Sequence, residues 1–532
     1  MELQDETRDG LRIFSVDAGR ETTRATLFFR VGQADETLPA SGWTHLLEHL
    51  ALHDWNDPRL AFNASVGLFL TRFEFDGETE AVFEHLGRLT RWFADPDLTH
   101  LGHEAKVLGA ESEQRPVGTL VANLEWRYGA RGPGLPAYRE IGLCRATEAR
   151  LREWCAEVFC AENAVLACDT PVPPDFGVAL PRGRRRPAAL PPQAVDTLPA
   201  VHRVRGGLVG SAVVTRSFAA SIAPDVLVRT LTRAFRELEG TSYAPWAELE
   251  RVDAETALLV FGADVSTEGS ATCGTLLNRC LRELAERGPD QAVLDEMTVS
   301  RSRHFRDEQQ APAVAWAAAV STLTEHEVQS AKEAEQLAAQ VTPSDLCTVF
   351  AEVRRTLLLG LPEESRVPSG FQEVAHPRWE TLDATSTHAH VDGVSRILLG
   401  PKGIQYSAPA SVVTVLYSDL AGLITYPDGA RRAVSADGWS VVVEPSLLRR
   451  GDAVTAALDA NAPASVVLPQ PARRPEEVPA RPPLPWRARR RTRAALRPVA
   501  GLFERLPVSG WVVWLVVFFA ARAVYGYFTS GH

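Results

Sequence analysis

The chain has 532 residues, too many for one hydrophobic core, and its 45% hydrophobic and 23% charged residues are ordinary for a globular protein. Its net charge of -11 argues against a general nucleic-acid-binding protein, so we expect no nucleic-acid partner. The seven cysteines are scattered and form no CxxC pair, which argues against a disulfide framework or a cysteine-ligated zinc. The acidic, polar N-terminus lacks the features of a signal peptide, and we expect the bulk of the protein in the cytoplasm.

Residues 1–180 alternate between strand-like and helix-like patterns. The run 25–31 has the apolar alternation of a strand, whereas 80–93 and 146–159 have the 3.6-residue periodicity of helices. A stretch rich in Pro and Arg, 171–192, then breaks the periodicity and is typical of a linker. We therefore expect one α/β unit here, ended by this linker.

A second α/β unit is predicted for residues 200–362. Its strand-like run is 257–261. Its long helical patterns, rich in Ala, Leu, Glu and Arg, cover 225–239, 269–287, 291–306 and 314–340.

Residues 372–462 have a different texture, with short strands separated by Gly, Asp and Pro turns and one closing helix at 451–460. The expected strands are 395–399, 411–417, 422–426 and 439–443. This pattern predicts a small β-sheet or barrel, and it resembles a bacterial pleckstrin-homology-like domain. The expected fold class is thus α+β, with two α/β repeats followed by a β-rich domain.

Residues 463–500 are rich in Pro and Arg and predict a disordered linker. Residues 508–528 are apolar except for Arg522 and are long enough to cross a bilayer as one helix; the alternative is a buried C-terminal helix. The arginines of 487–497 place the N-terminal side in the cytoplasm by the positive-inside rule, and they could bind anionic lipid. We expect a single-pass membrane protein with its N-terminal bulk in the cytoplasm.

The segment His45-Leu46-Leu47-Glu48-His49 carries the strongest chemical signal in the sequence. On a helix, His45 and His49 lie one turn apart on one face, where they can chelate one Zn²⁺. Glu48 can then act as general base on a water molecule. A histidine pair on a helix can also be a polar surface or a satisfied buried pair, and a zinc site needs a third protein ligand.

That ligand is expected from the segment 104–111, where two glutamates lie seven residues apart and so two turns apart on one helix face. One can ligate zinc while the other supports a ligand. Together, the HxxEH and ExxxxxxE segments resemble the pitrilysin/insulinase family of inverted HxxEH zinc peptidases. The resemblance implies that His45, His49 and Glu111 are zinc ligands, that Glu48 is the general base, and that Glu104 is the supporting glutamate.

The resemblance covers about residues 10–362. Residues 31–49 resemble the family's strand leading into the active helix, 63–66 its Asn-Ala turn, and 67–76 the edge strand on which substrate peptide is laid. In the second unit, Arg236 and Tyr243 resemble the family's Arg/Tyr pair, which implies roles in orienting substrate and binding the scissile carbonyl. The alternative for both is an ordinary helix-to-strand junction. The interval from His49 to Glu111 is shorter than in the family, which puts the cleft wall and substrate selection in doubt.

The expected function is therefore a membrane-tethered zinc endopeptidase acting on peptides or unfolded segments. The family encloses substrate between two halves, and this chain supplies one, so the resemblance implies a homodimer or a related partner chain. One alternative is a non-catalytic scaffold or partner subunit with the same fold. Another is a peptide-binding or sensor module at the membrane, with the β-rich domain as its working part.

Overall fold

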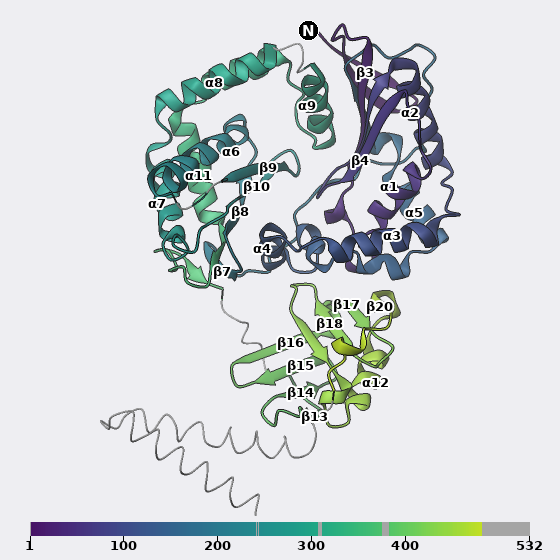
Figure 1. Cartoon of the computed structure of the whole chain (residues 1–532), viewed down its shortest axis with the longest axis vertical. Helices are drawn as coiled ribbons and strands as arrows, with labels where there is room; N and C mark the ends of the chain where they lie inside the picture. The colour runs from purple at the N-terminus through teal and green to yellow at the C-terminus, as the bar shows by residue number, and fades with distance from the viewer. Residues whose placement is uncertain (1, 241, 243, 307–310, 375–381, 481–532) are drawn as a thin grey trace, which may run out of the picture.

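The structure is a computed structural model that describes residues 2–480, except 241, 243, 307–310 and 375–381. Figure 1 shows two α/β units side by side, with a β-rich unit beneath the first. The chain is thus a mixed α/β protein with several separate sheets.

The first unit is built on a six-stranded sheet in the order β1-β2-β6-β3-β5-β4. Its strands are β1 (Leu3–Arg8), β2 (Leu11–Val16), β3 (Thr22–Phe29), β4 (Leu60–Val66), β5 (Thr71–Glu78) and β6 (Ala164–Cys168). Its helices are α1 (Trp43–Leu52), α2 (Thr79–Ala94), α3 (Leu101–Gln114), α4 (Thr119–Tyr128) and α5 (Glu148–Val158). Residues of α1, α2 and α5 pack with one sheet face in a core where the Phe93 and Phe159 rings stack at 4.4 Å. This core fixes α1, the predicted zinc helix, against the sheet.

The second unit repeats this topology in the order β12-β7-β11-β8-β10-β9, in which β7 to β11 take the places of β2 to β6. In both units the first of these strands pairs in parallel with the last. The strands are β7 (Ala200–Val204), β8 (Leu208–Thr215), β9 (Trp246–Arg251), β10 (Thr256–Ala263), β11 (Leu358–Pro362) and β12 (Gln372–Glu373). The helices are α6 (Phe218–Leu231), α7 (Cys273–Arg287), α8 (Gln291–Arg306), α9 (Ala311–Leu323), α10 (Ala331–Gln340) and α11 (Pro343–Thr356).

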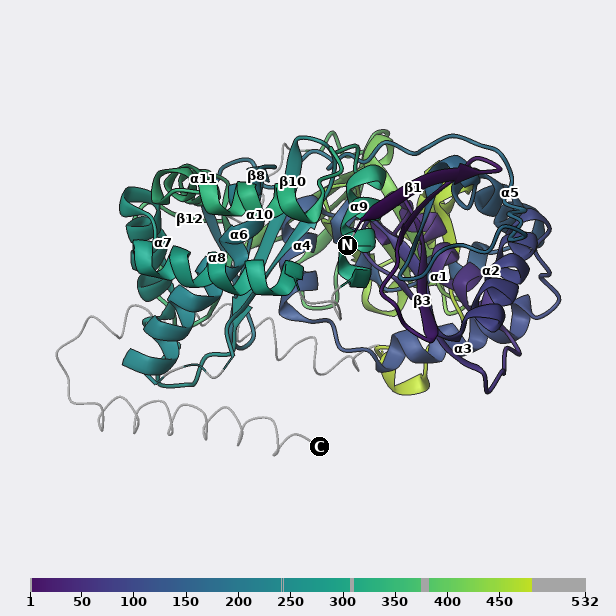
Figure 2. The same cartoon turned by 90° about the horizontal axis from the view of Figure 1, so that it is seen from above.

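Each unit sends one helix to the other unit's sheet. Helix α9 packs on the first sheet, where Trp316 meets Phe28 edge-on at 5.5 Å (Figure 2). Helix α4 packs on the second sheet, where its buried Arg127 donates to the carbonyl oxygens of Ser211 at 2.5 Å and Thr356 at 2.7 Å. The two units are therefore interlocked rather than joined only by the chain.

Three helix predictions in the second unit were wrong in extent. The helix predicted at 269–287 begins later, at Cys273. The pattern at 314–340 is two helices, α9 and α10, because the chain turns at Glu325, which has a positive φ of 54°. Ser330 then starts α10 afresh in a reciprocal capping box with Glu333. The helix predicted at 225–239 begins earlier, at Phe218, and its last part is the π-helical segment Thr232–Leu238.

The β-rich unit contains two four-stranded sheets and α12 (Gly451–Asn461). The first sheet contains β13 (Ser386–Ala389), β14 (Arg396–Leu399), β15 (Gly403–Ala408) and β16 (Ser411–Leu416). The second contains β17 (Leu420–Thr425), β18 (Arg431–Ser435), β19 (Ser440–Val443) and β20 (Val467–Pro469). Apolar residues of both sheets and α12 form one shared core.

Strand β20 corrects the prediction that 463–500 is a disordered linker. It pairs in parallel with β17, which makes it part of the β-rich unit. Just beyond it, Arg473 forms ion pairs with Asp428 at 2.6 Å and Glu444 at 2.7 Å. The Pro-rich composition does not prevent this, because an edge strand needs few backbone donors.

The predicted membrane anchor at 508–528 lies outside the described residues, as do 481–500 of the predicted linker. Within the part of the chain that the structure describes, no helix is both long and apolar enough to span a bilayer.

Candidate metal centre

Helix α1 begins at a tightly constrained corner. Gly42, its N-cap residue, has a φ of 90°, and a Cβ there would lie 2.7 Å from Cβ of Glu140. Only glycine satisfies both the backbone and the space. The buried Glu36 accepts hydrogen bonds from the backbone N–H groups of Gly42 at 2.8 Å and Thr44 at 2.7 Å, so that a carboxylate side chain caps the helix.

Helix α1 brings the side chains of the HxxEH motif close to Glu111 of α3. The His45 and His49 rings meet edge-on with centroids 4.9 Å apart. Nε2 of His49 lies 3.8 Å from Oε2 of Glu111, on α3, and 3.8 Å from Oε2 of Glu48. One ligand atom each from His45, His49 and Glu111 lies within 4.8 Å of the others. The structure thus brings together the three residues that the sequence indicates as zinc ligands.

Each histidine has a carboxylate within hydrogen-bond distance of its Nδ1. Nδ1 of His45 lies 2.6 Å from Oε1 of Glu140, and Nδ1 of His49 lies 3.2 Å from Oε2 of Glu104. A carboxylate on Nδ1 favours the tautomer with the proton there, which leaves each Nε2 as a lone-pair donor. Glu104 therefore lies where a supporting glutamate is expected.

Sequence reasoning missed Glu140 and Glu36. Glu140 comes from an irregular segment far from the motif and has no spacing relation to His45. Glu36 caps α1 with its side chain, but it lies six residues before the N-cap residue Gly42, directly after a 3-10 turn. Acidic caps are usually sought at the N-cap position itself. Neither residue had a local sequence signal that could have identified it.

Burial and charge shape the protonation of this cluster. Burial opposes the charged form of His45, but the hydrogen bond and charge of Glu140 outweigh it, and the pKa of His45 is raised. Burial raises the pKa of Glu48, although both histidines oppose the shift. For Glu36, burial raises the pKa to about 7 against the two backbone hydrogen bonds. A raised pKa makes Glu48 a stronger base for accepting a proton.

The donor set fits zinc. Two imidazole nitrogens and one carboxylate oxygen leave one of four tetrahedral positions open, as in catalytic zinc sites. The Nδ1 contacts of both histidines supply the outer hydrogen bonds that such ligands normally have. Glu111 is 44% exposed and forms an ion pair with Arg115, the C-cap residue of α3, so this candidate ligand faces the solvent side of the cluster.

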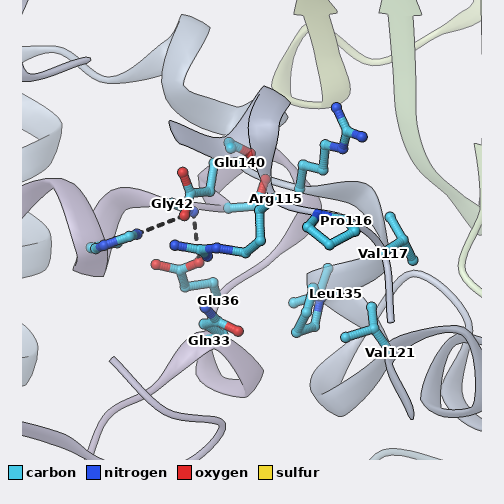
Figure 3. Close-up of a pocket in the computed structure, with 14 residues that line it drawn as sticks. Gln33, Glu36, Gly42, Arg115, Pro116, Val117, Val121, Leu135 and Glu140 are labelled. Atoms are coloured by element: carbon cyan, nitrogen blue, oxygen red, sulfur yellow. Dashed lines mark hydrogen bonds and ion pairs between the residues drawn. The ribbon is translucent and has the colours of Figure 1, made fainter. Parts of the chain in front are cut away.

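A cavity of about 140 Å³ opens beside His45. Figure 3 shows Glu36 and Glu140 on one side of it and Pro116, Val117 and Leu135 on the other. A space with one polar and one apolar wall next to the candidate metal ligands can receive a side chain of a bound peptide.

Strand β4 forms the edge of the first sheet and contacts α1. Among the described strands it pairs only with β5, so its outer edge can accept another strand. The sequence prediction of the edge strand was wrong. Residues 63–66 lie inside β4 and do not form a turn, and the edge strand is Leu60–Val66 rather than 67–76. The turn falls later, where Gly67 donates to the carbonyl of Leu70 at 2.9 Å.

The predicted Arg/Tyr pair is not tested by this geometry. Arg236 is an exposed residue of the π-helical segment that follows α6. Tyr243 lies outside the described residues. Their roles stay a prediction.

Comparison with known proteins finds solved structures with a similar fold but no match by sequence. No protein-family model and no curated protein matches the sequence. A protease from Helicobacter pylori shares 16% identity with a TM-score of 0.54, covering 68% of this chain and 100% of that one. The inactive domain of an M16 peptidase from Pseudomonas fluorescens shares 13% identity with a TM-score of 0.53, covering 70% and 100%.

A chain of Complex III2 from Candida albicans has a TM-score of 0.54 at 12% identity, covering 68% of this chain and 97% of that one. Solved structures with this fold therefore include a protease, an inactive peptidase domain and a chain of Complex III2. At such identities the likeness shows the fold alone: about two thirds of this chain has the two-repeat α/β fold of M16 peptidases.

Proposed function

We propose that this chain is a zinc-dependent endopeptidase that cleaves peptides or unfolded segments. The observation that carries the proposal is the pairing of each histidine of α1 with its own carboxylate, Glu140 for His45 and Glu104 for His49. This arrangement leaves both Nε2 atoms for a metal, with Glu111 as the third ligand.

A bound zinc ion would polarise the scissile carbonyl and acidify the attacking water. Glu48, buried between the two histidines, accepts the proton of that water and returns it to the leaving amine. Arg236 and Tyr243 would orient the substrate and hydrogen-bond its carbonyl, as the family resemblance implies.

The open edge of β4 would hold the substrate as an added strand, through main-chain hydrogen bonds that demand little of its sequence. Side-chain preference would come from the cavity beside His45. We further propose that a second copy or a related chain completes the enclosure, and that 508–528 tethers the protein to a membrane.

A second candidate function is a non-catalytic scaffold or partner subunit that binds peptides at the membrane. The observation in its favour is that an inactive M16 domain and a chain of Complex III2 have this fold. The presence of His45, His49, Glu48 and Glu111 in one cluster favours the peptidase.

A Glu48→Gln variant separates the two functions. If Glu48 is the general base, the variant keeps its zinc but loses about 10²- to 10⁴-fold in kcat on a quenched fluorescent peptide library. Glu113→Gln, an exposed carboxylate on α3, is the matched control and should keep wild-type activity. A wild-type chain that binds zinc but cleaves none of the library, or a Glu48→Gln variant as active as the control, would refute the peptidase assignment.

A further inference from the structure

A second group of metal-ligating side chains lies one helical turn beyond His49. His53 is the C-cap residue of α1, and its Nε2 lies 3.3 Å from Oδ2 of Asp54. Its ring stacks on that of His100, the N-cap residue of α3, with centroids 4.0 Å apart. One ligand atom from each of His53, Asp54 and His100 lies within 4.8 Å of the others.

The buried Glu104 orients this group as well as the first. Its Oε1 lies 2.8 Å from Nδ1 of His53, while its Oε2 lies 3.2 Å from Nδ1 of His49. One carboxylate therefore holds two imidazoles by the same nitrogen. For His53, as for His49, this leaves Nε2 free to donate a lone pair, and Nε2 is the atom that faces Asp54.

We propose that His53, Asp54 and His100 bind a second divalent transition-metal ion, zinc being the best match. Two imidazoles and one carboxylate form a donor set that selects zinc over calcium or magnesium, which prefer oxygen ligands throughout. None of the three residues belongs to the peptidase cluster, so the site does not depend on the proposed function.

This outer site binds metal more weakly than the first. The Asp54 side chain is 81% exposed and His100 is exposed, so both must be ordered when metal binds. The first site has a less exposed carboxylate, Glu111 at 44%, beside His45 and His49 side chains that are 13% and 21% exposed. Two affinities are therefore expected from one chain.

The test is a zinc titration of the metal-free full chain, read by equilibrium dialysis and elemental analysis. The wild type should bind about two zinc ions per chain in two separate phases, one for each three-ligand site. His100→Ala should lose the weaker phase alone, and His49→Ala should lose the tighter phase. His103→Ala is the matched control: it removes a neighbouring exposed histidine of α3, whose ring centroid is 6.2 Å from that of His53, and should keep both phases.

The result that overturns the proposal is a weaker phase that survives His100→Ala, or a wild type that binds one zinc sensitive only to His49→Ala. A wild type with one zinc that is lost in His100→Ala and kept in His49→Ala would support the outer site and refute the proposed catalytic zinc. The two proposals can therefore fail separately.

Discussion

Glu140 links an irregular segment of the first unit to the candidate metal ligand His45, and a Glu140→Gln variant tests that link. The carboxylate lies 2.6 Å from Nδ1 of His45, and the two side chains are only 9% and 13% exposed. Glutamine keeps the size and a hydrogen-bond acceptor but removes the charge. Solvent screens that charge little here, so the imidazole becomes a poorer donor to a metal on its Nε2.

Loss of such an outer carboxylate typically lowers metal affinity 10- to 100-fold, or about 1.4–2.7 kcal/mol. Competition against a fluorescent zinc chelator at neutral pH measures this change, and the melting curve of the metal-free variant confirms that it is folded. Glu113→Gln serves again as the control. A zinc affinity within about twofold of the wild type for folded Glu140→Gln would refute the role assigned to Glu140.

Three further predictions concern stability, read from urea unfolding of the metal-free protein. Gly42→Ala should lower the free energy of unfolding by about 2–5 kcal/mol, because of the positive φ and the contact with Glu140. Gly109→Ala is the control: it lies inside α3 with open space at its Cβ and should raise the free energy of unfolding by up to about 1 kcal/mol. Equal effects of the two substitutions would refute the steric reasoning. Arg127→Met should cost about 2–4 kcal/mol by removing the donor to the buried carbonyl of Ser211 and the half-buried carbonyl of Thr356, and a loss under about 1 kcal/mol would contradict this. The pKa of Glu36 is raised from 4.5 to about 7, so the folded state holds this proton more tightly than the unfolded state. As the pH rises between these two values, the free energy of unfolding of the wild type should fall by roughly 3 kcal/mol. Glu36→Gln should lack this loss. A pH profile unchanged in Glu36→Gln would show that another group carries it.

The sequence predicted best what is local and periodic. Helix 80–93 appears as Thr79–Ala94, because its apolar spacing follows one helix face, and helix 291–306 has the predicted bounds. The break at Glu325 was missed because the Ala-rich run 311–319 before it gives little contrast between helix faces, and because residues 320–330 contain no Gly or Pro to mark a break. Its positive φ has no sequence signal of the Gly or Asn kind.

The same distinction applies to the site. His45, Glu48 and His49 share one helix, and the glutamates of α3 share another, so their spacing was enough to predict that each set would lie together. The contacts of Glu140 and Glu36 depend on irregular segments whose course is set by packing across the fold. Spacing cannot predict such contacts, and the edge strand was displaced for the same reason: strand register depends on its partner.

The irregular segment that presents Glu140 is enclosed by the β-rich unit. Ala130 donates to the carbonyl of Ala436 at 3.1 Å, and Arg145 donates to that of Val467 at 2.8 Å. Leu135 and Tyr138 of this segment share a buried apolar cluster with Val434 and Leu468. The course of this segment, and with it the contact of Glu140 with His45, thus rests on backbone some 300 residues further along the chain.

Because this segment contacts both, binding to the β-rich unit and binding at the candidate metal site are expected to influence each other. If zinc binds at the proposed site, a molecule that binds the β-rich unit and shifts the segment 129–146 would change zinc affinity, and zinc would change the affinity for that molecule by the same factor. The two thirds of the chain that share a fold with known structures are therefore not an independent unit. Their chemistry can respond to whatever the remaining third binds.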